Sequence, residues 1–199
     1  MQIIIATNNQ GKKKEFQQLL SNHNVSISCL DEYPQIPEPP ETQETFDGNA
    51  LQKANFVFAH LNKEADIIVI ADDSGLCVEA LNGGPGVFSK RYSKEQTAES
   101  NNKKLLLELK QEENRRAYFH CSIAIVSHQG TNVVQGQCHG SIAKNQSGSG
   151  GFGYDPLFVP DAFSKQTMAT ITAAQKNTIS HRGSALQKAL PIIQKTLKK

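Results

Sequence analysis

The sequence lacks the features of membrane-spanning and exported chains. None of its apolar runs reaches the length of about 18 residues that a helix needs to cross a membrane. The first residues carry no basic segment, and the apolar run there is too short for a signal peptide. We therefore expect a cytoplasmic protein with no membrane partner.

The sequence also lacks a strong net charge and closely spaced cysteine pairs. The formal net charge is only +2, which gives no indication of a surface that binds nucleic acid. The four cysteines lie far apart without CxxC spacing, so we expect buried free thiols and no zinc site. Free thiols are typical of a reducing compartment, in agreement with a cytoplasmic location.

The order of apolar runs predicts a single α/β domain over residues 1–199. Short apolar runs predict strands at residues 3–6, 25–30 and 67–71, and helical spacing of apolar residues predicts a helix over 46–61. The chain contains no internal repeat, and its length suffices for one domain with a substantial core.

A predicted β-hairpin interrupts this alternation of strands and helices. Residues 119–126 and 131–139 have the pattern of two strands joined by a turn. We therefore expect a mixed sheet flanked by helices rather than a purely parallel sheet. One later helix is expected to begin near Ser93, with Gln96 as the capping partner of Ser93. Another is expected to begin after Ser180.

The strand at residues 67–71 is followed directly by Asp72, Asp73, Ser74 and Gly75. A buried strand that ends here would deliver two carboxylates to the edge of a sheet, where open α/β sheets bind their ligands. Adjacent carboxylates repel each other, so the pair is best tolerated in solvent or beside a cation. The competing interpretation is an ordinary polar turn after a strand.

A polar loop between the first strand and the first helix could bind an anion. Its residues are Thr7, Asn8, Asn9, Gln10, Gly11 and Lys12. Free N–H groups at a helix start favour phosphate, and the nearby lysines add positive charge. The GxxxxGK[ST] pattern of a P-loop is absent. The alternative is a capped helix with solvated lysines.

Acidic residues from separate segments could form a metal site. Glu41, Asp72 and Asp73, with Glu44 nearby in sequence, could gather around Mg²⁺, which binds one or two carboxylates together with phosphates and water. A carboxylate beside the metal could also take a proton from an attacking water. Acids are common in proline-rich connections such as residues 31–44, so Glu41 alone indicates little.

The glycine-rich segment at residues 148–156 satisfies GxGxxG, but an extended proline-containing stretch follows it instead of a helix. We therefore reject a dinucleotide fingerprint and interpret the segment as a loop that presents Phe152 and Asp155. The ring of Phe152 could stack on a base or could equally pack into the core. Further on, His181 and Arg182 stand at a helix start, where cations are unfavourable. They either bind a ligand that carries acceptors or point to solvent.

Together these segments resemble the inosine triphosphate pyrophosphatase family. The matching segments follow one another in the family's order and cover almost the whole chain. They are residues 6–12, 41–54, 71–76, 80–89, 151–156 and 179–183. One such motif would be weak evidence for the family, whereas several motifs in the same order are specific evidence for it.

The resemblance implies an elongated mixed sheet with two lobes and an active-site cleft, usually in a homodimer. It implies hydrolysis of ITP, dITP and XTP to the monophosphate and pyrophosphate with Mg²⁺, which cleanses the nucleotide pool. By matching positions, Asp73 would accept a proton and bind the metal, and Glu41 would be a second metal ligand. The substrate would be bound by Thr7, Asn8, Asn9, Gln10, Gly11, Lys12, Lys53, Ser74, Phe152, Gly153, Tyr154, Asp155, Lys176, His181 and Arg182.

Two positions depart from the family's pattern. Asn8 stands where many members have glycine, although asparagine tolerates left-handed backbone better than most residues. Gly48 stands where many members have glutamate, which could alter the affinity for Mg²⁺.

The choice of base must come from donors and acceptors in the pocket. Donors on His181 and Arg182 would suit the 6-keto group of hypoxanthine and xanthine and would mismatch the amino group of adenine. A related pyrophosphatase for other modified nucleotides, such as pyrimidines, would not need two donors beside a stacking ring. A nucleotide-binding module without activity would be expected to lack Asp73 or Lys12, and both are present.

Overall fold

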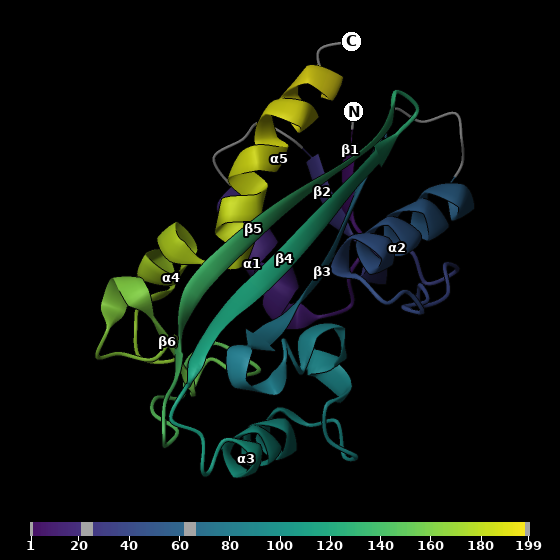
Figure 1. Ribbon diagram of the computed structural model, residues 1–199. Coiled ribbons are helices and arrows are strands. Elements are labelled where there is room, and N and C mark those ends of the chain that lie inside the picture. The colour runs from purple at the N-terminus through teal and green to yellow at the C-terminus, as the bar shows by residue number, and fades with distance from the viewer. Residues whose placement is uncertain (1, 21–25, 62–66, 198–199) are drawn as a thin grey trace. The chain divides into compact units, whose positions relative to one another are not determined.

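A computed structural model describes residues 2–20, 26–61 and 67–197. Six strands form one sheet in the order β2-β1-β3-β4-β5-β6 (Figure 1). Their bounds are β1 (Gln2–Ile5), β2 (Ser26–Cys29), β3 (Ile67–Val78), β4 (Arg116–Ser127), β5 (Gly130–Ile142) and β6 (Phe158–Pro160). Strand β1 is parallel to β2 and β3, whereas β5 is antiparallel to β6. The predicted mixed sheet is therefore confirmed.

Five α-helices accompany the sheet in the described residues. They are α1 (Gln10–Leu20), α2 (Phe46–His60), α3 (Ala98–Glu108), α4 (Ala173–Ile179) and α5 (His181–Leu197). Among the described residues, none of the helices combines the length and the hydrophobicity that crossing a membrane requires.

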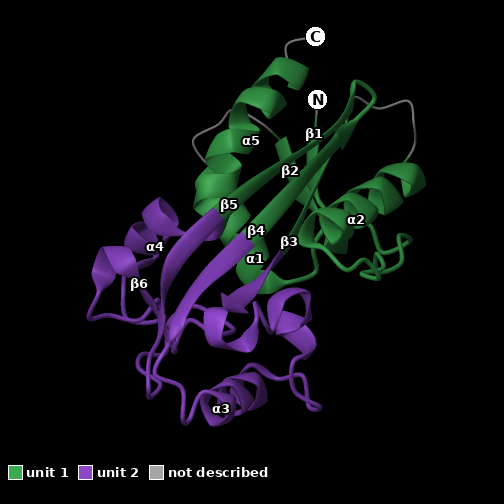
Figure 2. Cartoon of the chain, viewed as in Figure 1, with its two compact units in different colours: residues 1–73, 121–136, 182–199 green, residues 74–120, 137–181 purple. Residues whose placement is uncertain are grey.

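The chain divides into two compact units, each assembled from separate segments (Figure 2). Unit 1 contains residues 1–73, 121–136 and 182–199, and unit 2 contains residues 74–120 and 137–181. The division falls within β3, β4 and β5, so neither unit is one continuous stretch of sequence. The single domain and the cleft expected from the sequence stay predictions.

Strand β1 of unit 1 is buried on both faces from Ile3 to Ile5. Ile3 and Ile5 of β1 pack in one cluster with Phe16 of α1 and with residues of α5. Ile4 and the following Ala6 pack in a second cluster with residues of α2. Successive side chains of a strand point to opposite faces, so one short apolar strand contributes to both cores.

Strand β3 continues beyond the end that the sequence predicted. It was expected to end at Ala71, but it runs to Val78, so Asp72 and Asp73 lie inside the strand. The apolar pattern resumes at Leu76, which is buried in the core of unit 2. The prediction that the strand ends at the acids is therefore wrong, and the pleat sends their side chains to opposite faces.

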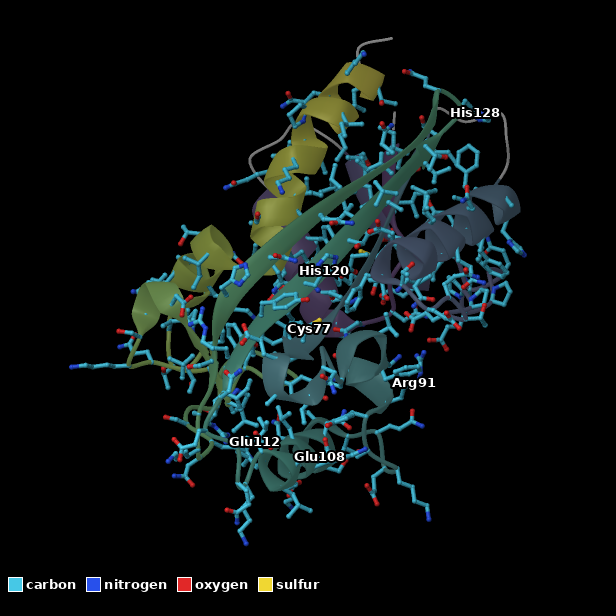
Figure 3. The ribbon with its side chains drawn as sticks, in the orientation of Figure 1. Cys77, Arg91, Glu108, Glu112, His120 and His128 are labelled. Carbon is cyan, nitrogen blue, oxygen red and sulfur yellow. The ribbon has the colours of Figure 1, made fainter. Side chains whose placement is uncertain are left out.

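The predicted hairpin is confirmed and is longer than expected. Strands β4 and β5 are neighbours in the sheet, and only His128 and Gln129 lie between them. His128, labelled at the turn of the hairpin in Figure 3, packs edge-on against Phe58 of α2, with ring centroids 5.1 Å apart.

Helix α3 begins at a different residue from the one predicted. Its first residue is Ala98, and its N-cap is Thr97, whose side chain accepts the Ser100 N–H at 3.1 Å. Ser93 Oγ accepts the Gln96 N–H, also at 3.1 Å, but this bond closes a turn before the helix. Two cap-like pairs therefore follow each other closely, and only the second one opens a helix.

Ser180 separates two helices. Helix α5 begins at His181, as predicted, but the preceding α4 was not predicted, and Ser180 is its C-cap. Thr172 caps the start of α4 by accepting the Gln175 N–H at 3.2 Å. This capping box is the local signal that identifies the helix.

The cap assignment in α3 can be tested by mutation. Thr97→Ala should lower the free energy of unfolding by about 1 kcal/mol, because the Ser100 N–H loses its acceptor at the helix terminus. Glu95→Ala, at an exposed residue before the helix, should cost less. Urea unfolding followed by circular dichroism measures both, and an equal or larger loss in Glu95→Ala would contradict the assignment.

Candidate active site

Asp72 lies in a cluster of buried charges between β3, α1 and α5 in unit 1. Its Oδ2 atom is 3.0 Å from Lys12 Nζ and 2.9 Å from Arg182 Nη2. Arg182, only 1% exposed, also donates through Nη1 to Glu15. Burial alone would raise the pKa of Asp72, but Lys12 and Arg182 hold that pKa well below its ordinary value. Asp72 is therefore ionised and holds Lys12 beside the loop after β1.

Cys121 of β4 also faces Asp72. Its Sγ atom is 4.0 Å from Asp72 Oδ2, and burial raises the pKa of the thiol to about 12. The thiol therefore stays protonated and can donate to the carboxylate. All four cysteines are buried and free, as predicted.

Asp73 makes a separate set of contacts, with α2 in unit 1. Its Oδ1 atom accepts a hydrogen bond from Lys53 Nζ at 3.2 Å, and its Oδ2 atom accepts one from Asn49 Nδ2 at 3.1 Å. Lys53 Nζ also donates to Glu41 Oε1 at 2.6 Å. One ammonium group therefore lies between two carboxylates.

The pKa of Asp73 shifts in the direction opposite to that of Asp72. Burial raises the pKa of Asp73, and the negative charge of Glu41 raises it further, although Lys53 opposes both. Burial would lower the pKa of Lys53, but the charges of Asp73 and Asp72 more than offset it, and this pKa is raised. Asp73 therefore has a higher proton affinity than an ordinary aspartate, which suits a group that must accept a proton.

Glu41 and Asp73 fit a divalent cation by their chemistry. Their oxygens already converge on a positive charge, the ammonium of Lys53. Mg²⁺ commonly binds one or two protein carboxylates and completes its shell with phosphate oxygens and water. These two side chains therefore have the donor atoms that a magnesium ion beside a triphosphate requires.

The expectation that Asp72 joins Glu41 and Asp73 around one cation is wrong. Asp72 points to the other face of β3 and bonds to Lys12 and Arg182, and Glu44 is exposed. Within the described ranges, the only group of three potential metal-ligating residues is Cys29, Asp31 and Glu32. The pleat of β3 separates the two neighbouring aspartates.

The loop after β1 is organised by its own side chains. Thr7 Oγ1 accepts the Asn9 N–H at 3.2 Å, and Asn9 Oδ1 accepts the Lys12 N–H at 3.1 Å. Asn9 therefore acts as a cap at the start of α1, where N–H groups can bind an anion. The remaining predicted residues of this loop are exposed or half-buried: Asn8, Gln10 and Gly11.

In unit 2, Asp155 holds the glycine-rich loop together. Its Oδ2 atom accepts the backbone N–H of Phe152 at 2.8 Å and a hydrogen bond from Lys176 Nζ at 2.7 Å. Lys176 Nζ also lies 4.8 Å from the centre of the Phe152 ring. Phe152 is half-buried, whereas Asp155 and Lys176 are buried. The structure thus brings three of the predicted nucleotide-binding side chains together.

The other predicted residues of unit 2 are mostly buried. Tyr154 packs in the core of this unit and donates its hydroxyl hydrogen to the Ser89 carbonyl at 2.8 Å, so it anchors the loop. The ring of His181 stacks on Phe119, with centroids 4.8 Å apart and an interplanar angle of 17°. Ser74, the first residue of unit 2, is half-buried.

Asn49 and Glu15 were not predicted from the sequence. Asn49, which is 1% exposed, accepts the Gln43 N–H at 2.9 Å and donates to Asp73, so it joins the Glu41 segment to the carboxylate. The sequence signal for Asn49 was its spacing of four residues from Lys53, which puts both side chains on one face of the helix. Glu15 gave little signal, because its partner Arg182 is remote in sequence.

The glycine at position 48 has a packing consequence. A Cβ atom there would lie 2.8 Å from Gln43 Cβ, which is closer than real Cβ contacts allow, and 3.0 Å from Thr45 Oγ1, which is a tight contact. The segment before α2 therefore packs into the space that a glutamate side chain would need. The effect of Gly48 on metal affinity stays a prediction.

Comparison with known proteins identifies similar sequences and structures over almost the whole chain. A model of the Ham1 family matches residues 3–192. A dITP/XTP pyrophosphatase of Bacillus anthracis is 42% identical over 193 residues, which cover 94% of this chain and 93% of that protein. One from Desulfotalea psychrophila is 46% identical over 186 residues, or 92% of this chain and 81% of that protein. The structure of the Staphylococcus aureus Ham1 protein, 38% identical, superposes with a TM-score of 0.85 and covers 98% of each chain.

The buried cluster around Asp72 predicts a specific dependence of stability on pH. The unfolded chain binds a proton at Asp72 near the ordinary pKa of about 3.9, whereas the folded protein does so only at lower pH. The contribution of Asp72 to stability is therefore complete above the unfolded pKa and is lost as the pH falls toward the folded pKa.

Asp72→Asn should lower the free energy of unfolding at pH 7 by about 3–5 kcal/mol, because Arg182 and Lys12 lose a buried negative partner. It should also flatten the loss of stability between about pH 5 and about pH 2. Asp161→Asn, at an exposed carboxylate paired with Arg116, is the control and should change little. Urea unfolding across this pH range measures the free energy of unfolding of each variant. An identical pH dependence of that free energy in wild type and Asp72→Asn would contradict the assignment.

Proposed function

The chain belongs to the Ham1 family, and we propose that it hydrolyses the non-standard purine nucleotides ITP, dITP and XTP to the monophosphate and pyrophosphate. The observation that carries this proposal is the buried Asp73 carboxylate, bonded to Lys53 and Asn49 beside Glu41. The relatives named dITP/XTP pyrophosphatase support the choice of substrates. Such an activity removes nucleotides that would otherwise enter nucleic acid.

Residues of unit 1 would bind the triphosphate. The N–H groups at the start of α1 face an anion favourably, and the ammonium of Lys12 is held next to them by Asp72. Lys53 adds a second cation close to Asp73. Neutralisation of the phosphate charges by groups fixed in advance is usually the largest contribution to phosphoryl transfer.

Asp73 would act as the proton acceptor. As the oxygen of a water molecule forms a bond to the α-phosphorus, one of its protons passes to the Asp73 carboxylate. The bond from the α-phosphorus to the bridging oxygen breaks, and pyrophosphate leaves. Lys53 and Asn49 keep both carboxylate oxygens oriented, as the third group of a catalytic triad orients the base.

Glu41 and Asp73 would hold Mg²⁺ together with the substrate. When bound, the ion would supply positive charge next to the phosphate oxygens. Lys53 would keep the two carboxylates close together before the ion arrives, because it already bonds to both of them.

Residues of unit 2 would bind the base. Phe152 offers an aromatic face held beside Lys176 and Asp155. His181, kept in place by stacking on Phe119, would donate to the 6-keto group. The other predicted donor, Arg182, is buried and bonds to Asp72 and Glu15, so the proposal gives it no contact with the base. The homodimer, the cytoplasmic location and the role in cleansing the nucleotide pool are parts of the same proposal.

A panel of nucleotides tests the proposal. With Mg²⁺, the protein should release monophosphate and pyrophosphate from ITP, dITP and XTP with kcat/KM about 100-fold higher than from ATP, because adenine mismatches the donors. Quantification of all phosphate-containing products by chromatography measures this selectivity. Release of inorganic phosphate and nucleoside diphosphate, or equal use of ATP and ITP, would contradict it.

The same assay with Asp73→Asn tests the assigned role of this residue. Turnover of ITP should fall by about 1,000-fold or more, because the amide cannot accept the proton. The variant should stay folded at pH 7, because Lys53 keeps Glu41 as a negative partner and Asn49 can still donate to the new amide oxygen. Asp161→Asn is again the control, and full activity in Asp73→Asn would exclude the assigned role.

A further inference from the structure

The glycine-rich loop of unit 2 has a tightly defined backbone. Gly148, Gly151 and Gly153 have positive φ angles of 81°, 72° and 61°. Glycine adopts such angles far more readily than other residues do. The side chain of Asp155 closes the loop from inside by accepting the Phe152 N–H. The position of the Phe152 ring therefore depends on the conformation of a few backbone groups.

One hydrogen bond reaches this backbone from a separate helix. The side chain of Asn102, on α3, donates from Nδ2 to the carbonyl oxygen of Gly153 at 3.1 Å. Both residues belong to unit 2. The Gly153 carbonyl belongs to the peptide that joins Gly153 to Tyr154, so this bond fixes a peptide group one residue beyond Phe152.

The bond is made to the tight turn that follows the Phe152 ring. Residues Phe152 to Asp155 form a turn that is closed by the Asp155 N–H and the Phe152 carbonyl oxygen at 3.2 Å. The carbonyl of Gly153 belongs to the central peptide of that turn, and turn types differ in the orientation of this peptide. Asn102 therefore favours one turn conformation over the alternatives.

The burial of Asn102 argues against a role in packing alone. The residue is 3% exposed, and its Oδ1 atom has no hydrogen-bond partner in the described part of the chain. A buried acceptor without a partner destabilises a fold, whereas a leucine of similar size would avoid that cost. The donated bond to Gly153 is the interaction for which the amide is needed.

We infer that Asn102 is a positioning residue for base recognition, which holds the Gly153 carbonyl and thereby keeps the Phe152 ring in its base-stacking orientation. This inference rests on the proposed function, in which the Phe152 loop receives the purine. Asn102 itself acts through the loop and has no assigned contact with the substrate. The loss of Asn102 should therefore weaken recognition of the base and leave the phosphate-binding residues of unit 1 unaffected.

Two variants of the full-length chain test this role. Asn102→Leu removes both polar atoms at similar volume, and Asn102→Asp replaces the donor by an acceptor that repels the Gly153 carbonyl. Each should raise KM for ITP by about tenfold and lower the ratio of kcat/KM for ITP to that for ATP by a similar factor. Inhibition by pyrophosphate, which lacks a base, should not change.

Thr97→Ala is the matched control, because it weakens the same helix without touching the loop. Circular dichroism checks that each variant is folded, and Asn102→Leu keeps the test decisive if Asn102→Asp does not fold. Variants that lose stability but keep the wild-type KM and ITP-to-ATP ratio, as Thr97→Ala should, would overturn the inference. Wild-type protein that does not turn over ITP in this assay would instead contradict the proposed function.

Discussion

The pleat of β3 is the constraint on which the candidate site depends. Asp72 and Asp73 are adjacent in sequence, and in a loop their charges would repel each other at close range. Because the strand continues through them, their side chains point to opposite faces of the sheet. Asp72 then extends the face formed with α1 and α5, and Asp73 extends the face formed with α2.

This separation gives two neighbouring carboxylates different chemistry. Asp72 is fully buried against Lys12 and Arg182, which lower its pKa and make it a permanent negative charge. Asp73 is buried with Glu41 nearby, and its pKa is raised. When two environments drive the pKa values of paired acids apart, one acid becomes the structural ion and the other becomes the group that exchanges protons. The geometry therefore assigns Asp72 to holding Lys12 and leaves Asp73 for the reaction.

Much of this arrangement could be predicted from local sequence patterns. The apolar run that forms β1, the helical spacing in α2 and the hairpin of β4 and β5 are all local signals, and the structure confirms them. The motif residues Glu41, Lys53 and Asp73 do meet in space. Their meeting depends on α2 packing beside β3, a tertiary contact that the local patterns of the two elements did not indicate.

The remaining features depend on tertiary contacts that a local pattern does not contain. The sequence predicted a strand end at the acids, because polar residues usually stop a buried strand, yet Leu76 and Val78 find a core of their own in unit 2. The bond from Arg182 to Glu15 joins residues from the two ends of the chain. The bond from Asn102 to Gly153 similarly joins a helix to a loop that is remote in sequence.

The central claim is that a water molecule attacks the α-phosphorus of the nucleoside triphosphate. Hydrolysis of ITP in ¹⁸O-labelled water, followed by mass spectrometry of both products, tests it most directly. The account predicts that the label enters the monophosphate and that pyrophosphate stays unlabelled. Label in the pyrophosphate would show attack at the β-phosphorus and would contradict the assignment of the reacting centre.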